Sequence, residues 1–387
     1  MSRLTVLHVV PQDSWRGAQV YAGRLRDTLA RDDTQRHVAV ALFDAPAAGL
    51  RPDLVASGRP GVARRLGLDP VAAQRLHTLV RHERADVVVA HGGESMKYAV
   101  LASGRVPVVY YKIGLSTAEL ARPWRRRLYR ALARRTAMGV AVSTAVRDQM
   151  RDVLGMPADR LRVVPNARDP ETYHPDAGAA GADSVAEDAA GPPRVLFVGQ
   201  LEPGKRPELF LDVVARLRHD GVEFTPVIIG DGELRSVVGP RAEQLGVSML
   251  GVRDDVPDWL RDAAVLVMTS AADTEGMPGV CIEAGLTGVP VVTTSSAGAA
   301  DVVVDGVTGH VVADDSVTEL AARTANLLRD PDLRRIMGVR ARAHCIDTYS
   351  IAAGAAQWRQ VAADVLEPAR QVGPTSLTTH PSTQRTP

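Results

Sequence analysis

Two glutamates in the second half of the chain, Glu275 and Glu283, have seven residues between them. From Glu275 the segment passes through Pro278 into a helix-like run that carries Glu283, and it leaves that run through Gly288-Val289-Pro290. Proline at the front of a helix and glycine with proline after it are start and stop signals, so the sequence predicts Glu275 in a loop and Glu283 on the helix behind it. Ionised carboxylates accept hydrogen bonds from neighbouring hydroxyl groups. The pair suits a ligand with two hydroxyl-bearing parts, although a helix with two unrelated glutamates would have the same spacing.

The segment 274–294 resembles the signature of the retaining glycosyltransferases of family 4, which have the GT-B fold. The resemblance implies that Glu275 contacts the donor sugar and that Glu283 holds the ribose of a nucleotide. The residues after the first glutamate are expected in the same donor site: Gly276, Met277, Pro278 and Gly279.

A second candidate segment, residues 198–206, follows an apolar run and precedes a helix-like run. Lys205 would then stand at a helix N-terminus, where a diphosphate is favoured. The segment resembles the phosphate-binding segment of the same family, in which an Arg usually occupies the position of Gln200 and a Lys that of Lys205. The Lys matches and the Arg does not, so Arg206 or Arg16 is a candidate for the missing charge.

The same segment nearly matches a P-loop, because Gly199, Gly204 and Lys205 have the required spacing. A P-loop then needs Ser or Thr to hold magnesium, and the next residue is Arg206. This departure argues against a nucleotide triphosphatase.

His91 ends the apolar run 86–90 and is followed by two glycines. The arrangement is similar to a segment of the family in which a His lies beside the donor sugar and the reacting centre. A histidine at a strand end can also be purely structural. The two glycines favour a site that needs room, so we expect His91 in the active site.

Three glycine-containing loops are further candidates. Gly17 follows the first apolar run and would let backbone approach a phosphate or sugar, as in the N-terminal Gly-Gly loop of the family, although Arg16 occupies one glycine position. Gly230 and Gly232 lack the third glycine of a dinucleotide fingerprint. In the resembled family their loop and the one at Val252 flank the nucleotide base.

Two further positions match family elements only in part. Asn166 lies in a Pro-Asn-Ala segment where the family has Pro-Asn-Gly, and its expected role is in the hinge and the cleft. Residues 295–301 occupy the place of a glycine-rich loop that ends in Glu, and here the last residue is Asp301.

Alternating strand-like and helix-like runs predict the elements that position these residues. Six apolar runs in the first half and five in the second read as buried parallel strands. They are residues 4–10, 37–43, 86–90, 106–111, 138–142 and 161–164, then 194–198, 224–229, 247–250, 264–268 and 289–293. We therefore predict an α/β protein of the GT-B type, with two Rossmann-like domains and a cleft between them.

The domain boundaries follow from composition. Residues 176–193, rich in Ala, Gly, Asp and Pro, read as a linker between an N-terminal acceptor-side domain, 1–175, and a nucleotide-sugar domain, 194–350. A helix at 351–366 is expected to pack back on the first domain, as the resemblance implies. The polar tail 369–387 reads as disordered.

Bulk composition excludes several classes. The chain has 387 residues and a net charge of +1, which gives no sign of nucleic-acid binding. Its two cysteines fit no disulfide framework or zinc site, so a cytoplasmic location is expected, and no apolar run is long enough to span a membrane. The basic segment 122–135 could contact the inner face of a membrane or a polyprenyl-phosphate acceptor, or be a solvated helix face.

Together these features predict a retaining glycosyltransferase that moves a sugar from a nucleoside-diphosphate sugar to an acceptor hydroxyl. His91, Glu275 and Lys205 are the predicted catalytic residues, with no cofactor and no divalent metal implied. The predicted donor-binding residues are Gly17, Gln200, Lys205, Arg206, Gly230, Gly232, Val252, Glu275, Gly276, Met277, Pro278, Gly279 and Glu283. A nucleotide-sugar epimerase of the same fold would form product from the donor alone, and a non-catalytic binding protein would release no nucleotide.

Overall fold

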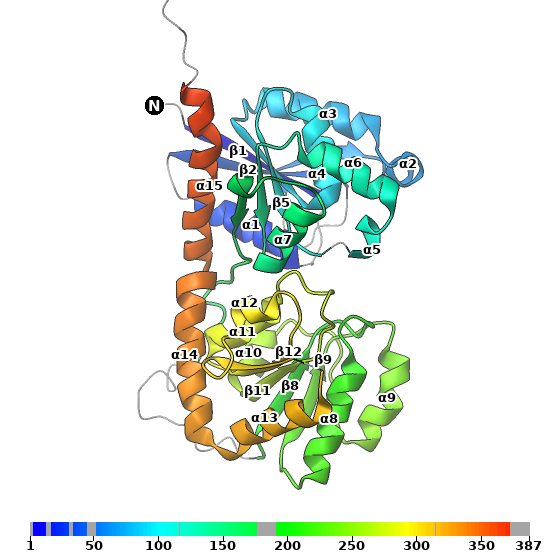
Figure 1. Ribbon diagram of the computed structural model, residues 1–387, viewed down its shortest axis with the longest axis vertical. Coiled ribbons are helices and arrows are strands. Elements are labelled where there is room, and N and C mark those ends of the chain that lie inside the picture. Colours follow the sequence, from blue (N-terminus) through cyan, green and yellow to red (C-terminus); the bar gives the residue numbers. More distant parts are fainter. Residues whose placement is uncertain are drawn as a thin grey trace, which may run out of the picture.

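The computed structural model describes residues 3–12, 17–30, 34–44, 52–115, 117–175, 191–313 and 315–371. Two α/β domains are stacked along the long axis of the molecule, and each is built on a twisted sheet with helices on both faces (Figure 1). All recorded strand pairs are parallel. The prediction of two Rossmann-like domains is confirmed.

The first domain has a seven-stranded sheet in the order β3-β2-β1-β4-β5-β6-β7. Its strands are β1 (Leu4–Gln12), β2 (Gln35–Phe43), β3 (Leu54–Gly58), β4 (Val87–His91), β5 (Val108–Lys112), β6 (Met138–Ala141) and β7 (Leu161–Val163). Its helices are α1 (Gly17–Leu29), α2 (Pro60–Leu66), α3 (Pro70–His82), α4 (Gly92–Ala102), α5 (Thr117–Leu120), α6 (Pro123–Ala133) and α7 (Thr144–Asp152), with a 3-10 turn at Ala158–Arg160.

The second domain has a six-stranded sheet in the order β10-β9-β8-β11-β12-β13. Its strands are β8 (Arg194–Val198), β9 (Thr225–Ile229), β10 (Ser248–Met249), β11 (Ala263–Met268), β12 (Val291–Thr294) and β13 (Gly309–Val312). Its helices are α8 (Pro207–His219), α9 (Arg235–Gln244), α10 (Val256–Arg261), α11 (Gly279–Thr287), α12 (Ala299–Val302), α13 (Val317–Arg329) and α14 (Pro331–Tyr349).

Two of the four edge strands, β3 and β13, were not predicted. Both are short, and β3 contains Ser57 at φ 47°, which interrupts any regular pattern. In β13 a Cβ on Gly309 would lie 2.2 Å from the carbonyl oxygen of Val291, so the glycine that obscures the strand in the sequence is required for its pairing with β12. An edge strand buries less apolar surface than a central one, which weakens its sequence signal.

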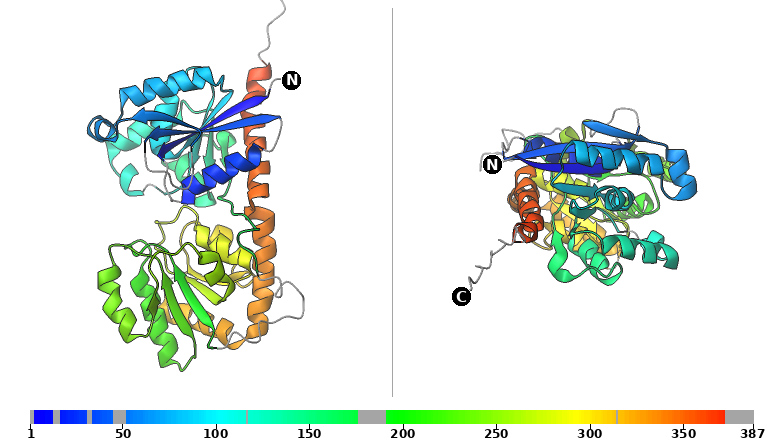
Figure 2. Two further views of the ribbon diagram at one scale, coloured as in Figure 1. Left: turned by 180° about the vertical axis from the view of Figure 1, so that it is seen from behind. Right: turned by 90° about the horizontal axis from the view of Figure 1, so that it is seen from above.

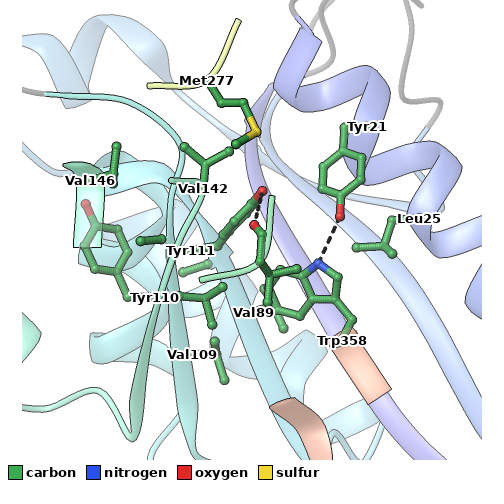
Figure 3. Close-up of a cluster of buried hydrophobic side chains, with 14 of the residues drawn as sticks. Tyr21, Leu25, Val89, Val109, Tyr110, Tyr111, Val142, Val146, Met277 and Trp358 are labelled. Carbon is green, nitrogen blue, oxygen red and sulfur yellow. Dashed lines mark hydrogen bonds between the residues drawn. The ribbon is translucent and has the colours of Figure 1, made fainter. Parts of the chain in front are cut away.

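The C-terminal helices connect the two domains. α14 packs on the second domain, Ser350 separates it from α15 (Ile351–Gln371), and α15 runs along the first domain (Figures 1 and 2). There the indole nitrogen of Trp358 donates a hydrogen bond to the hydroxyl of Tyr21 on α1 at 3.1 Å (Figure 3). α15 extends to Gln371, beyond the predicted end at residue 366. Residues 176–190 of the predicted linker and 372–387 of the predicted tail lie outside the described residues.

Across the described ranges, none of the helices combines the length and the apolar composition needed to cross a bilayer.

Candidate functional site

Four loops of the second domain meet at the carboxyl ends of its strands, where α/β proteins bind ligands. They follow β8, β9, β11 and β12. Backbone hydrogen bonds join them: Leu201 donates to the carbonyl of Asp231 at 3.0 Å, and Ala297 donates to that of Ala272 at 3.0 Å. The loops therefore form one surface that faces the first domain.

Gly230 and Gly232 hold two of these loops in close contact. A Cβ on Gly230, which has φ 136°, would lie 1.9 Å from the carbonyl oxygen of Gly199. A Cβ on Gly232 would lie 2.5 Å from that of Leu201. In this structure the two glycines let the loop after β9 pass directly over the loop after β8.

Lys205 and Glu275 form an ion pair at the centre of this surface. Glu275 is buried, and its Oε1 also accepts a hydrogen bond from the hydroxyl of Ser270 at 2.8 Å. The hydroxyl of Thr269 donates to the carbonyl oxygen of Lys205 at 2.9 Å. The Lys205 side chain remains 26% exposed. The structure thus brings together the lysine and the first glutamate that the sequence singled out, and the lysine side chain remains partly exposed to solvent.

The residues after Glu275 lie against the first domain. A Cβ on Gly276 would lie 2.2 Å from the carbonyl oxygen of Ile113, in the loop after β5. Met277 is buried and reaches into the hydrophobic cluster of the first domain beside Val142 and Tyr111 (Figure 3). The predicted donor loop is therefore also a contact between the domains.

Glu283 forms a second ion pair, with Arg168 of the segment that leaves the first domain. Nε of Arg168 and Oε1 of Glu283 are 2.6 Å apart, and the side chains are only 14% and 15% exposed. The backbone of Arg168 bonds to the crossing helices, since its N–H donates to the carbonyl of Tyr349 and its carbonyl accepts from the N–H of Ile351. Burial, together with the nearby Glu283 carboxylate, raises the pKa of Tyr173 to about 12.

Four predicted donor residues have other surroundings. Arg206 donates to both oxygens of Asp315, at 2.6 and 2.9 Å, and to the carbonyls of Thr269 and Ser270. Its guanidinium therefore holds the loop after β11 in place. Gln200 and Val252 are exposed, the latter at 80%. Gly17 begins α1, and Arg16 lies outside the described residues.

His91 lies in the core of the first domain as one end of a row of histidines on three adjacent strands. Nδ1 of His8 is 3.0 Å from Nε2 of His91, and Nε2 of His8 is 3.0 Å from Nδ1 of His37. Trp358 stacks on His91 and Tyr111 meets it edge-on. Burial lowers the pKa of His91 to about 3 and the pKa of His8 well below its usual value.

The row determines which nitrogens carry protons. Nε2 of His37 lies 3.0 Å from the amide oxygen of Gln35, so it is the donor and Nδ1 of His37 accepts from His8. Nδ1 of His8 then accepts from Nε2 of His91. Nδ1 of His91 is left as a buried acceptor without a hydrogen-bond partner among the described residues. Such a group costs about 1–3 kcal/mol unless a ligand satisfies it.

Sequence reasoning missed Arg168 and His8, because each acts through a residue far away in the chain. It also missed Ser270, which lies only five residues before its partner Glu275 but matches no motif. It also missed Asp301 as a contact between domains: its carboxylate accepts from the backbone N–H of Thr144 at 2.8 Å, at the start of α7. In the sequence, only the position of Arg168 shortly after Pro165-Asn166 could have drawn attention to it. No cluster of His, Cys, Asp and Glu suited to a metal ion occurs within the part of the chain that the structure describes.

Comparisons with known proteins find similarity in sequence and in fold. Residues 15–172 match the family model described as Glycosyltransferase Family 4, and residues 192–330 match the model described as Glycosyl transferases group 1. HepE from Anabaena, crystallised with UDP and glucose, has the same fold, with a TM-score of 0.77 and 20% identity over 94% of this chain and 100% of that one. The prediction of the GT-B fold is confirmed.

Two curated relatives are similar over part of their length. The Vi polysaccharide biosynthesis protein VipC/TviE of Salmonella typhi is 36% identical over 34% of this chain and 24% of its own. A GDP-mannose-dependent phosphatidylinositol monomannoside mannosyltransferase of Mycolicibacterium smegmatis is 28% identical over 58% of this chain and 60% of its own. The chain thus spans less than two thirds of each of these relatives.

The buried Arg168–Glu283 pair yields a stability prediction. Arg168→Met and Glu283→Gln should each lower the free energy of unfolding by about 3–5 kcal/mol, because each leaves one buried charge unpaired. The double variant should cost less than the sum of the two. Urea unfolding measures all four proteins. Arg216→Met, which breaks an exposed pair with Asp220, is the matched control and should cost at most about 1 kcal/mol. If the losses in free energy of unfolding of the two single variants add up to that of the double variant, the prediction is wrong.

The buried histidines yield a pH prediction. The pKa of His91 is about 3 in the folded protein and near 6.5 when unfolded, so between these values the unfolded chain binds more protons. Stability should fall as the pH drops below 6.5, by up to about 1.4 kcal/mol per pH unit for this ring. Urea unfolding between pH 7 and about pH 5 tests this. His91→Gln should make the dependence less steep, and the part that remains comes from His8, whose pKa is also lowered. His82→Gln, at an exposed histidine, should leave the dependence unchanged.

Proposed function

Because the chain belongs to the family 4 (group 1) glycosyltransferases, we propose that it transfers a sugar from a nucleoside-diphosphate sugar to an acceptor hydroxyl, with retention of anomeric configuration. The Lys205–Glu275 pair is the single observation that supports this proposal most directly. It places an ammonium group and a carboxylate side by side at the carboxyl ends of β8 and β11, where the second domain faces the first.

Lys205 would stabilise the leaving group. In the reaction the bond between the anomeric carbon and the diphosphate oxygen breaks, and the acceptor oxygen bonds to the same face of that carbon. The acceptor proton passes to the departing phosphate. Negative charge develops on the diphosphate, and a fixed cation there lowers the barrier. The Lys205 side chain is partly exposed, which leaves it accessible to a bound diphosphate, and the proposal needs no divalent metal for this role.

Glu275 and Glu283 would bind the hydroxyl groups of the donor. Oε1 of Glu275 is already bonded to Lys205 and Ser270, which leaves Oε2 for a sugar hydroxyl. Oε1 of Glu283 is bonded to Arg168, which leaves its Oε2 for a ribose hydroxyl. Each carboxylate is therefore oriented by protein contacts before the donor arrives, which lowers the entropic cost of binding.

His91 would act beside the donor sugar. Its Nδ1 is an acceptor nitrogen that the row of histidines orients, and it has no partner within the described chain. We propose that a hydroxyl of the donor sugar donates to this nitrogen when the domains close on both substrates. The low pKa keeps the ring neutral, so that it remains an acceptor.

The first test is nucleotide-sugar binding and turnover. A sugar of UDP, GDP, ADP or dTDP at about one hundred times its Kd should stabilise the protein by roughly 2.7 kcal/mol. Lys205→Met should lower kcat for nucleotide release by about 10²–10³. Arg241→Met, which removes a surface cation paired with Asp212, is the control and should leave kcat unchanged.

Other outcomes identify the alternatives. An isomerised sugar nucleotide from the donor alone would indicate an epimerase. Binding without nucleotide release from any acceptor would indicate a binding protein. The absence of a thermal shift with every nucleotide sugar would contradict the proposed function.

We also propose that α6 contacts an anionic membrane surface. Trp124 and Leu128 of this helix are exposed, at 58% and 42%, and Arg126 and Arg127 lie exposed between them. Exposed apolar side chains interleaved with arginines are typical of helices that lie on anionic lipid.

Co-sedimentation with phosphatidylglycerol vesicles tests this contact. The double variant Arg126→Gln/Arg127→Gln should weaken binding about thirtyfold, from about 1 kcal/mol for each basic residue. Arg323→Gln, at an exposed arginine of the second domain, should have no effect. Equal binding to neutral phosphatidylcholine vesicles would contradict an electrostatic contact.

A further inference from the structure

The first domain contains a cavity of about 130 Å³ on the face of its sheet opposite to His91. Tyr111 faces His91, whose ring it meets edge-on, and Figure 3 shows the Tyr110 side chain on the other side of the sheet. Because side chains alternate between the two faces of a strand, Lys112 lies on the same face as Tyr110. Helices α4, α5 and α6 enclose that side. The lining residues are Gly93, Glu94, Tyr110, Lys112, Leu120, Tyr129 and Leu154.

The cavity lies beside the loop that we assign to the donor. Lys112 donates from Nζ to the carbonyl oxygen of Gly114 at 2.5 Å. The Cα of Gly114 is 2.6 Å from the position of a Cβ on Gly276, so no side chain fits between the two loops. Gly276 follows Glu275 directly in the chain. A ligand in the cavity would thus be next to the residues that we propose hold the donor sugar.

The lining offers both hydrogen-bond donors and an acceptor. Lys112 is only 2% exposed and brings its Nζ to the lining. Glu94 contributes a carboxylate, which Lys97 fixes by an ion pair at 2.6 Å. Tyr110 and Tyr129 are buried and bring aromatic rings with hydroxyl groups. Hydroxyl groups both donate and accept, so they match such a mixed set, whereas a phosphate would be repelled by Glu94.

Gly93 fixes the shape of the cavity. A Cβ at this position would lie 2.6 Å from Cε1 and 3.0 Å from the hydroxyl of Tyr129. Only glycine therefore lets the Tyr129 ring lie against the first turn of α4. The sequence suggested that the glycines after His91 leave room for a site near that residue. In the structure the space beside Gly93 lies on the other face of the sheet, and the Tyr129 ring fills it.

We propose that the cavity is the acceptor subsite and that it binds an uncharged, polyhydroxylated ring, either a sugar or a cyclitol. This inference rests on the proposed function, because it assigns the second substrate of the same reaction. Glu94 accepts from ring hydroxyls, Lys112 donates to them, and Tyr129 packs against the ring.

The test uses saturation-transfer NMR on the full chain in the presence of its nucleotide. Methyl α-D-glucoside, methyl α-D-mannoside, myo-inositol and inorganic phosphate are the probes. At least one neutral ring should bind, and the glycoside and inositol arms separate a sugar from a cyclitol. Glu94→Gln and Lys112→Met should each weaken that binding about tenfold, the effect of losing a hydrogen bond to a charged group.

A steric variant keeps the test independent of charge. Gly93→Ala retains every polar group but displaces the Tyr129 ring, and it should also weaken binding. Gly61→Ala is the matched control, since a Cβ there meets no atom within 4 Å, and it should bind as the wild type does. Phosphate binding alone, no binding of any neutral ring, or equal binding by wild type, Glu94→Gln and Gly93→Ala would each overturn the inference. Failure of the nucleotide to bind wild type would instead contradict the proposed function.

Discussion

The arrangement of the two domains depends on one buried ion pair. Arg168 and Glu283 come from different domains and are both largely shielded from water. Burying either charge alone would be strongly unfavourable, so each requires the other in place. Arg168 is also bonded to the backbone on both sides of Ser350, where the chain crosses between the domains for the second time. The pair thus connects the helix that follows the donor loop to the crossing helices.

Glycines allow the remaining contacts between loops. Gly276 lies against the loop after β5, and a Cβ on Gly298 would lie 2.4 Å from the carbonyl oxygen of Gly276. The backbones at Gly298, at Gly276 and in the loop after β5 therefore pack directly on one another, without side chains between them. The Gly276 contact also keeps Met277 directed into the cluster of the first domain (Figure 3). A donor loop packed in this way has little freedom to rearrange independently of domain closure.

The elements that depend on a local pattern of residues could be predicted from the sequence. The central strands were predictable because both faces of a parallel sheet are buried and the strands read as apolar runs. The loops with Lys205 and Glu275 followed, because parallel strands bring their carboxyl ends to one edge. Pairings between distant residues were not predictable. His91 has the expected strand-end position, yet its contacts with His8 come from a neighbouring strand whose register no local pattern records.

The crossing at Ser350 has a mechanical consequence. The chain joins the domains at two places, once between residues 175 and 191 and again at Ser350, and α14 and α15 run along one edge of the molecule (Figures 1 and 2). Two domains joined along one edge of the molecule would rotate about a hinge at that edge. The cleft between them would then open on the opposite side, toward α5 and α9 (Figure 1). Substrates would enter past α5, beside the proposed acceptor cavity and next to the basic helix α6. With α6 on a membrane surface, as proposed, a lipid-linked acceptor would reach the donor without leaving that surface.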